Sequence, residues 1–175
     1  MDADSQILQQ LQLQLSQDTE DVRISIVFDH DTVTSGDYVP MKKAEAAPSI
    51  SVEGRAVDSA ELFTYVLVDI DAPDPKAPTH APFLHYILAD LSVDEQGAQG
   101  EQQQEEVVVV PYYPVTPPVG EHRYVSLLFR QQGDNLDGHD TTLTEKRSNF
   151  DVAGFATEHK LELVTTSSFH SHQDD

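Results

Sequence analysis

A nearly continuous apolar run over residues 62–70 is the feature that most restricts the fold of this chain. The run includes Tyr65, Val66, Leu67 and Val68, and a strand of this composition is typically buried on both faces. We therefore place it at the centre of a β-sheet. Similar apolar runs predict further strands at residues 83–91, 107–110 and 123–129.

A different pattern near the N-terminus predicts strands with one buried face. Apolar residues alternate with polar ones over residues 22–28, and a further strand is predicted around Ile50 and Val52. No helix alternates with successive strands as a series of βαβ units requires, and no internal repeat is visible. The predicted class is mainly β, with a few peripheral helices.

Two segments carry apolar residues at helical spacing. Residues 1–20 form a predicted N-terminal helical segment with Ile7, Leu8, Leu11 and Leu15 as its apolar residues. We expect this helix to pack on the domain's own surface, and a partner-binding helix is the alternative.

A second helix is predicted near the C-terminus, where Asn149 or Asp151 is suited to cap its first turn. Its apolar face comprises Phe150, Val152, Phe155 and Ala156.

Length and charge restrict the function. The 175 residues, 38% of them hydrophobic, suit one compact domain, which we place at residues 21–175. Lys and Arg number 10 against 31 Asp and Glu, a formal net charge of -21. This charge repels nucleic-acid phosphates and anionic membrane surfaces. We expect no nucleic-acid partner and weak or no binding to anionic membranes.

Three further features concern the cellular setting. No run approaches the roughly 20 apolar residues that cross a bilayer, and the N-terminus has no basic flank or apolar signal core. The chain has no cysteine, which excludes disulfides and thiolate chemistry. A cytoplasmic protein is the simplest interpretation. The Gln/Glu-rich segment 97–106 is predicted to be a surface loop, because its composition cannot bury a core.

Three polar pieces adjoin the predicted strands, at positions where loops present side chains to ligands. They cover residues 69–73, 83–86 and 117–124. Together they predict a pocket containing carboxylates, two imidazoles and a phenol.

The two carboxylates of the first piece are expected to have different roles. We assign Asp69 to the pocket as an acceptor and Asp71 to structural support, while Pro73 restricts the loop that follows. His85 lies within an apolar run, where a hydrogen-bonded core histidine is the alternative to a functional one. His122 follows Gly120 at the junction of a loop and a strand, a position that favours a functional imidazole.

If the imidazoles of His85 and His122 converge with Asp69, they can donate to an anionic oxygen while the carboxylate fixes a tautomer. Arg123 suggests phosphate binding, but alternation along the strand favours a structural ion pair with a carboxylate.

Other chemistry receives less support. His170 and His172 lack a third nearby ligand of defined geometry, so no metal site is predicted. The chain has no Gly-rich phosphate loop, no HExxH motif and no nucleophile elbow. We predict no cofactor.

The three polar pieces, in this order, resemble the phosphatidylethanolamine-binding protein (PEBP) family, which includes the Raf kinase inhibitor protein and plant flowering regulators. Residues 65–73 resemble its Asp-Pro-Asp-Ala-Pro motif, and residues 117–124 resemble its Pro-Pro, Gly and His-Arg-Tyr signature. Residues 150–161 resemble the family's late helix. The similarity spans residues 22–161, and fungal members are the most similar in character.

The resemblance implies a central antiparallel β-sheet, a second smaller sheet and a shallow anion-accepting pocket. By motif position, Asp69, His85 and His122 correspond to the acidic and imidazole residues of the pocket. The resemblance adds Pro117, Tyr124 and Phe169 as ligand-binding residues, and Asp71, Pro73 and Arg123 as structural support.

The chain departs from the family pattern at several positions of the pocket: Ile70, Leu84, Thr116 and Phe169. Ile70 replaces a proline, Leu84 replaces the first histidine of a pair, and Phe169 lies near a position where some members have a tyrosine. These changes make the pocket more apolar and weaken the link to phospholipid.

Three functions are compatible with these residues. The first is a regulatory protein that binds a small anionic or polar ligand and engages a protein partner such as a kinase or a protease. The second is a cofactor-free enzyme in which Asp69, His85 and His122 perform acid–base catalysis of a cyclisation, aldol reaction or dehydration. The third is a carboxypeptidase-type protease inhibitor that uses the N-terminal segment.

Overall fold

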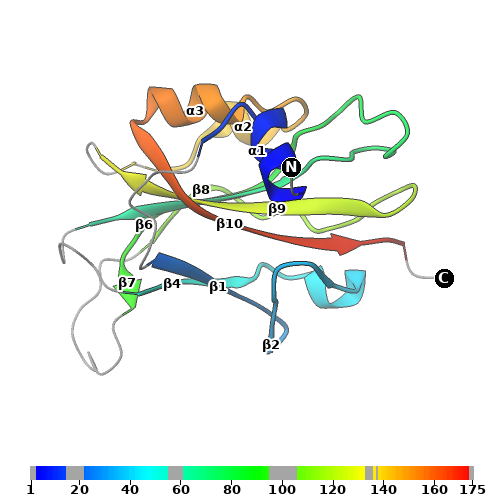
Figure 1. Ribbon diagram of the computed structural model, residues 1–175, viewed down its shortest axis with the longest axis horizontal. Coiled ribbons are helices and arrows are strands. Elements are labelled where there is room, and N and C mark those ends of the chain that lie inside the picture. The colour runs from blue at the N-terminus through cyan, green and yellow to red at the C-terminus, as the bar shows by residue number, and fades with distance from the viewer. Residues whose placement is uncertain are drawn as a thin grey trace.

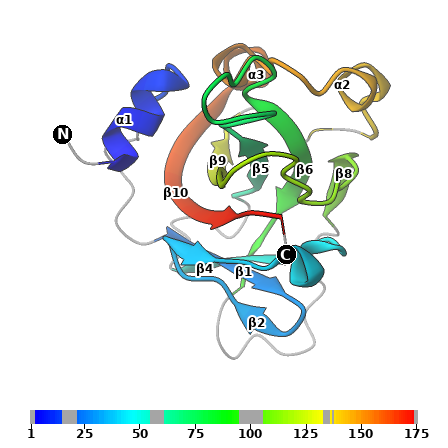
Figure 2. The ribbon, with the colours of Figure 1, turned by 90° about the vertical axis from the view of Figure 1, so that its right-hand side faces the viewer.

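The computed structural model describes residues 3–14, 22–54, 61–94, 106–132, 136 and 138–173. Figure 1 shows three layers, in which a larger sheet lies between a smaller sheet and the helices α1 (Ala3–Gln10), α2 (Thr141–Glu145) and α3 (Val152–Glu158). The view at right angles in Figure 2 shows the helices on the face of the larger sheet that is turned away from the smaller sheet. Within the described ranges, no helix is long and apolar enough to cross a membrane.

The larger sheet has six strands in the order β3-β10-β9-β5-β6-β8. Their bounds are Asp37–Tyr38 (β3), Phe63–Asp69 (β5), Phe83–Leu91 (β6), Val107–Val110 (β8), His122–Gln131 (β9) and Leu161–Ser171 (β10). Neighbouring strands are antiparallel, except that β3 runs parallel to β10.

The smaller sheet has four strands in the order β2-β1-β4-β7. Their bounds are Val22–Phe28 (β1), Asp31–Thr32 (β2), Ser49–Gly54 (β4) and Val93–Asp94 (β7), and the 3-10 helix η1 (Met41–Ala44) lies between β3 and β4 in the chain. The prediction of a mainly β protein with a central antiparallel sheet, a second smaller sheet and a few peripheral helices is confirmed.

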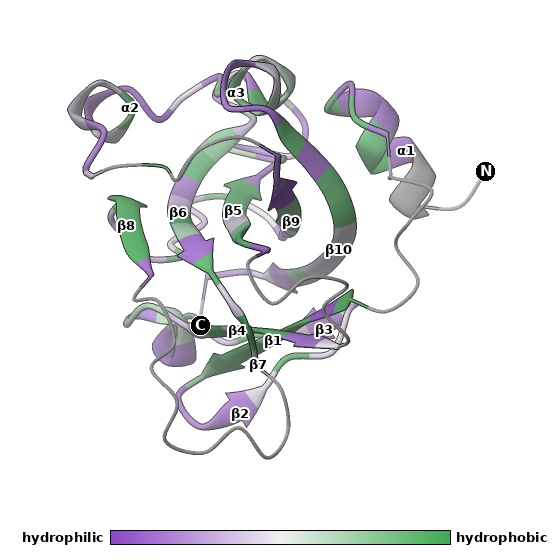
Figure 3. Ribbon diagram, turned by 90° about the vertical axis from the view of Figure 1, so that its left-hand side faces the viewer, coloured by the Kyte–Doolittle hydropathy of each residue, from purple (hydrophilic) through white to green (hydrophobic). Residues whose placement is uncertain are grey.

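The central position of β5 follows from its side chains, all of which are buried. Phe63, Tyr65 and Leu67 pack into the core between the two sheets. Val66 and Val68 point to the other face and pack into the core beneath the helices, because side chains alternate along a strand. In the hydropathy colouring of Figure 3, β5 and β8 are largely green. A strand that is apolar on both faces thus separates two cores.

Several elements have the bounds that the sequence predicts. The strands β1, β6 and β8 match residues 22–28, 83–91 and 107–110, while β9 extends the predicted run at both ends.

The predicted C-terminal helix is α3. Asp151 is its N-cap, because the Asp151 side chain accepts a hydrogen bond from the backbone N–H of Gly154. Asn149 instead adopts a left-handed conformation, with φ 57°.

The local sequence predicts no strand at β10, although β10 pairs with β9 along its whole length. Residues 165–168 read Thr-Thr-Ser-Ser, and their side chains are only partly buried. A register shift between Leu163 and Thr165 also interrupts the alternation of side chains. The backbone hydrogen bonds to β9 stabilise this strand without the apolar pattern that would reveal it.

The N-terminal helix α1 packs against the larger sheet through Ile7, Leu8 and Leu11, which are buried in the core beneath the helices. The predicted face continues to Leu15, which lies outside the described residues, as do residues 97–105 of the Gln/Glu-rich loop.

Candidate functional site

A cavity of about 290 Å³ lies where three neighbouring strands of the larger sheet meet. β5 ends there at Asp69, β6 begins at Phe83, and β9 begins two residues before Tyr124. Asp69 is in register with Phe83 on one side and with Tyr124 on the other. The cavity is lined by Asp69, Ala72, Pro73, His80, Phe83, His85, Tyr113, Thr116, Pro118 and Tyr124.

The structure brings part of the predicted site to this cavity. The predicted site residues that line it are Asp69, Pro73, His85 and Tyr124. The other predicted ligand-binding residues are buried and lie outside the lining: Pro117, His122 and Phe169.

His122 forms hydrogen bonds through both ring nitrogens. Its Nε2 lies 2.8 Å from the carbonyl oxygen of Val119, which can only accept, so Nε2 carries a proton. Its Nδ1 lies 2.7 Å from Oδ2 of Asp69, and a second proton lies between these atoms. Burial raises the pKa of Asp69, and hydrogen bonds from His122 and the backbone N–H of Asp71 oppose this rise. The shared proton gives the Asp69–His122 pair no net charge and leaves His122 no donor for a ligand.

His85 uses one ring nitrogen within the protein. Its Nδ1 lies 2.6 Å from the carbonyl oxygen of Tyr113 and donates to it, so the neutral ring has a bare Nε2. Burial lowers the pKa of His85 to about 4; the bond to Tyr113 opposes this shift, and the charges of Arg147 and His122 add to it. At neutral pH, His85 therefore offers the cavity a hydrogen-bond acceptor.

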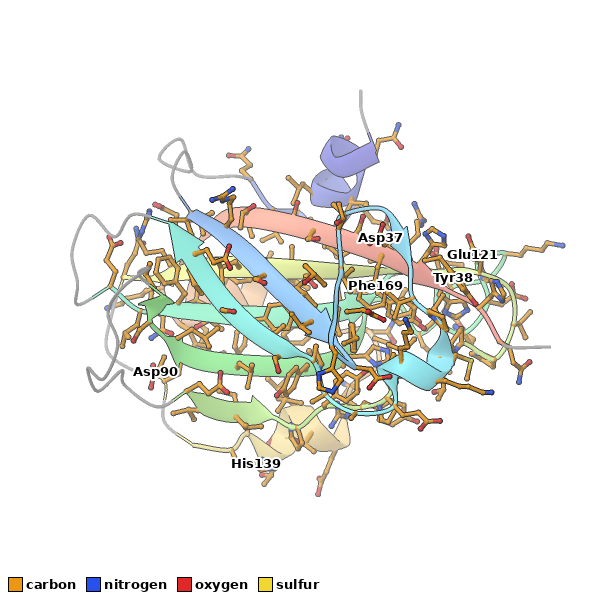
Figure 4. The ribbon with its side chains drawn as sticks, turned by 90° about the horizontal axis from the view of Figure 1, so that it is seen from below. Asp37, Tyr38, Asp90, Glu121, His139 and Phe169 are labelled. Atoms are coloured by element: carbon orange, nitrogen blue, oxygen red, sulfur yellow. The ribbon has the colours of Figure 1, made fainter. Side chains whose placement is uncertain are left out.

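Tyr124 supplies a buried hydroxyl beside the carboxyl group of Asp69, and it forms no hydrogen bond of regular geometry with the described residues. Burial, the charge of Asp69 and a hydrogen-bonding interaction with the Asp69 carboxyl group raise the pKa of Tyr124, so the hydroxyl keeps its proton. The ring stacks on Phe169 with centroids 5.1 Å apart and an interplanar angle of 11°. The stacked Phe169 ring therefore supports Tyr124. In Figure 4, Phe169 lies toward the end of the sheet that carries Glu121, with Asp90 toward the other end.

Asp71 contacts Arg123 at the start of β9. Oδ2 of Asp71 accepts hydrogen bonds from the backbone N–H and from Nε of Arg123, at 2.7 Å and 3.0 Å. Oδ1 accepts from Nη2 at 3.0 Å. The Asp71 side chain is buried, whereas 54% of the Arg123 side chain is exposed. The pair joins the end of β5 to the start of β9.

The loop between β5 and β6 contains cis peptide bonds at Ala72-Pro73 and Ala81-Pro82. The Nδ2 of Asn149 donates to the carbonyl oxygens of Thr79 and Ala81, at 3.0 Å and 3.1 Å. The backbone N–H of Asn149 also donates to the carbonyl oxygen of His80. These bonds hold the loop that carries Pro73 and His80 against the segment before α3.

Sequence reasoning missed several residues that form or support the cavity wall: His80, Tyr113 and Arg147. The guanidinium of Arg147 donates to the carbonyl oxygens of Leu84, His85 and Pro111. It also lies 5.4 Å from the centre of the Tyr113 ring. Tyr113 could have been suspected, because it follows a strand within a Pro-Tyr-Tyr-Pro segment. Arg147 gives no such signal, since its partners are backbone carbonyls.

The two C-terminal histidines flank an aromatic ring. The ring centroids of His170 and His172 lie 5.6 Å and 4.7 Å from that of Tyr38. Within the described part of the chain, no three His, Asp or Glu side chains are grouped so that they could hold a metal ion.

A comparison with known families assigns the chain to one of them. The model of the phosphatidylethanolamine-binding protein family matches residues 27–169, so this chain belongs to that family. Rice MOTHER of FT and TFL1 homolog 2 is 32% identical over 76% of this chain and 71% of its own length. Arabidopsis FLOWERING LOCUS T is 26% identical over 87% of this chain and 80% of its own length.

Solved structures support the fold. A carboxypeptidase Y inhibitor, complexed with its cognate proteinase, superposes with a TM-score of 0.74 at 21% identity, covering 98% of this chain and 92% of the inhibitor. A phosphatidylethanolamine-binding protein from Plasmodium vivax gives a TM-score of 0.68 at 14% identity, covering 93% and 88%.

Proposed function

We propose that this protein binds a small polar ligand in the Asp69–His85–Tyr124 cavity and acts as a regulatory member of its family. The observation that carries the proposal is a matched pair of polar groups on one cavity. The Tyr124 hydroxyl is a donor that forms no hydrogen bond of regular geometry with the described residues, and Nε2 of His85 is an acceptor, because Nδ1 donates to Tyr113.

The energetics favour a ligand at this place. A buried hydroxyl without a hydrogen bond costs about 1–3 kcal/mol, and a ligand oxygen that accepts from Tyr124 recovers part of this cost. The Asp69–His122 pair shares a proton across 2.7 Å, so the net-neutral pair does not repel an anionic oxygen as an isolated carboxylate would. Small ligands with both an acceptor and a donor fit these groups.

The regulatory part of the proposal concerns the rim of the cavity. Tyr113 is 43% exposed and lines the cavity, and Val119 is 53% exposed on the segment that supplies the carbonyl partner of His122. A protein partner, such as a kinase or a protease, that binds this rim would sense whether the cavity is occupied.

The other candidate functions receive less support from the geometry. His85 has a pKa of about 4, which makes it a weak general base at neutral pH. Protease inhibition through the N-terminal segment is less favoured, because Ile7, Leu8 and Leu11 are buried against the larger sheet and are not free to contact a partner.

Nuclear magnetic resonance titration of the ¹⁵N-labelled protein with acetate and, separately, with inorganic phosphate at pH 6 tests the proposal. We expect saturable shifts near Asp69, His85 and Tyr124, with at least fivefold weaker binding in His85→Ala. His122→Ala, which removes the proton-sharing partner of Asp69, should also weaken binding. His139→Ala is the control, because this exposed histidine is absent from the lining. Non-saturable shifts, or equal affinity in His85→Ala, would overturn the proposal.

A further inference from the structure

Residues 107–120 contain no Asp, Glu, Lys or Arg, in a chain whose formal net charge is -21. The exposed Glu106 and Glu121 lie at the two ends of this neutral run. Residues 111–118, the proline segment, read Pro-Tyr-Tyr-Pro-Val-Thr-Pro-Pro, with a proline at every third position from 111 to 117. The polyproline II helix has three residues per turn, and proline favours this extended conformation. The sequence of the proline segment is therefore that of a ligand for proline-recognition domains.

Contacts with the body of the protein hold the proline segment in place after β8. The backbone N–H of Tyr113 donates to the carbonyl oxygen of His85 at 2.8 Å. The hydroxyl of Tyr112 donates to the carbonyl oxygen of Ala44 at 2.6 Å. The Val115 side chain is buried in the core between the two sheets. The segment is thus ordered before a partner binds, which reduces the conformational entropy lost on binding.

The outer side of the proline segment is exposed to solvent. Its exposed residues are Tyr113, Pro114, Thr116 and Pro118, and Tyr113 is 43% exposed. Val119 follows directly and is 53% exposed. An exposed strip of neutral, largely apolar side chains on an otherwise acidic protein is typical of an interaction surface.

We propose that the proline segment is the docking site of a domain that binds proline-rich extended chains in a groove lined by aromatic side chains. Domains of the SH3, WW and EVH1 classes bind their ligands in this way. The adjacent Tyr113 and Pro114 present an aromatic ring and a proline ring to such a groove.

This inference rests on the partner part of the proposed function, and it specifies the chemistry of that partner. Tyr113, Thr116 and Pro118 also line the cavity. A domain docked on the proline segment would therefore contact the outer wall of the cavity.

The charge distribution favours such a partner over a second copy of this chain. Each copy has a formal net charge of -21, so two copies repel each other. A groove whose rim carries Lys or Arg would complement the exposed carboxylates of Glu106 and Glu121. The partner is expected to combine an aromatic groove with a basic rim.

Titration of the ¹⁵N-labelled protein with purified, unlabelled SH3, WW and EVH1 domains tests the inference. At least one of these domains should bind saturably, with the largest shifts at residues 113–119. Acetate is titrated separately into the same protein, because it probes the cavity without a protein partner.

Variants of one exposed proline assign the binding to the proline segment. Pro114 is exposed and is absent from the cavity lining, so Pro114→Ala should bind acetate as the unaltered protein does. It should bind the domain about tenfold more weakly. Pro114→Glu should abolish domain binding, because its carboxylate would lose hydration in an aromatic groove. Pro78→Ala is the matched control, since Pro78 is also exposed but lies between β5 and β6.

No saturable binding by any of the three domains, or equal affinity of Pro114→Ala and Pro78→Ala, would overturn the inference, and saturable acetate binding would still support the proposed ligand. Shifts at residues 113–119 that depend on the protein's own concentration would assign the segment to a second copy and also overturn the inference. Domain binding without acetate binding would overturn the ligand part of the proposed function and leave the docking site standing.

Discussion

The hydroxyl of Tyr124 is buried beside the carboxyl group of Asp69 and has no hydrogen-bond partner among the described residues. Removing this hydroxyl should stabilise the protein. We expect Tyr124→Phe to raise the free energy of unfolding by about 1 kcal/mol, because it deletes an unpaired buried polar group and retains the ring. Urea denaturation measures the change.

The control for this prediction is a buried tyrosine whose hydroxyl is paired. The hydroxyl of Tyr65 lies 2.7 Å from Oγ of Ser126. Tyr65→Phe should therefore lower the free energy of unfolding by about 1 kcal/mol, the opposite sign. Equal losses in Tyr124→Phe and Tyr65→Phe would show that the Tyr124 hydroxyl has a partner.

The pH dependence of stability should report on His85. Burial lowers its pKa from 6.5 to about 4 in the folded protein, so between these values the unfolded chain binds a proton that the folded protein does not. The contribution of neutral His85 to the free energy of unfolding is complete above pH 6.5 and is lost as the pH falls. The loss should reach about 2 kcal/mol at pH 5 and about 3 kcal/mol at pH 4.

Urea denaturation at pH 7, 5 and 4 measures this loss against His85→Asn, in which the titrating group is absent. The unaltered protein should lose more stability than the variant between pH 7 and pH 4. Parallel losses in the two proteins would contradict a buried, neutral His85.

The contact between Asp71 and Arg123 should appear as a coupling in a double-mutant cycle. Asp71→Ala should cost about 2 kcal/mol, because it removes the acceptor of the Arg123 backbone N–H as well as the ion pair. Arg123→Ala should cost about 1 kcal/mol, since its guanidinium is half exposed. The double variant should cost about as much as Asp71→Ala alone. Additive losses in urea denaturation would show that the side chains act independently.

Gly120 should tolerate a side chain less well than Gly138. Both have positive φ, +74° and +67°, but only at Gly120 would a Cβ meet another residue, 3.0 Å from Cδ of Pro75. We expect Gly120→Ala to lose about 1 kcal/mol more stability than Gly138→Ala, because strain in the backbone is common to both and the clash is not. Equal thermal or urea stability of the two variants would contradict close packing of this turn on the β5–β6 loop.

The sequence predicts the strands whose side chains follow one apolar pattern. β5 is apolar on both faces and β1 has a clear period of two, so the pattern of apolar residues alone predicts both strands. β10 was missed because backbone pairing with β9 holds a partly exposed Thr/Ser segment in place. Such pairing depends on the tertiary fold and leaves little pattern in the local sequence.

The sequence places Asp69, His85 and Tyr124 near one another, because each adjoins or begins a strand of the same sheet. It does not predict the protonation of the site. The Val119 carbonyl occupies Nε2 of His122, and the Tyr113 carbonyl occupies Nδ1 of His85. These backbone partners are set by the turn at Gly120 and by the chain leaving β8. The donor and acceptor character of the cavity therefore emerges only from the three-dimensional structure.

The affinity of Tyr124→Phe for acetate at pH 6, measured by ¹⁵N titration alongside its stability, tests most directly whether the Tyr124 hydroxyl holds a ligand. We expect the variant to bind acetate about tenfold more weakly, the equivalent of one lost hydrogen bond of about 1.4 kcal/mol, while being at least as stable as the unaltered protein. Unchanged acetate affinity in a folded Tyr124→Phe variant would contradict a ligand held by the Tyr124 hydroxyl.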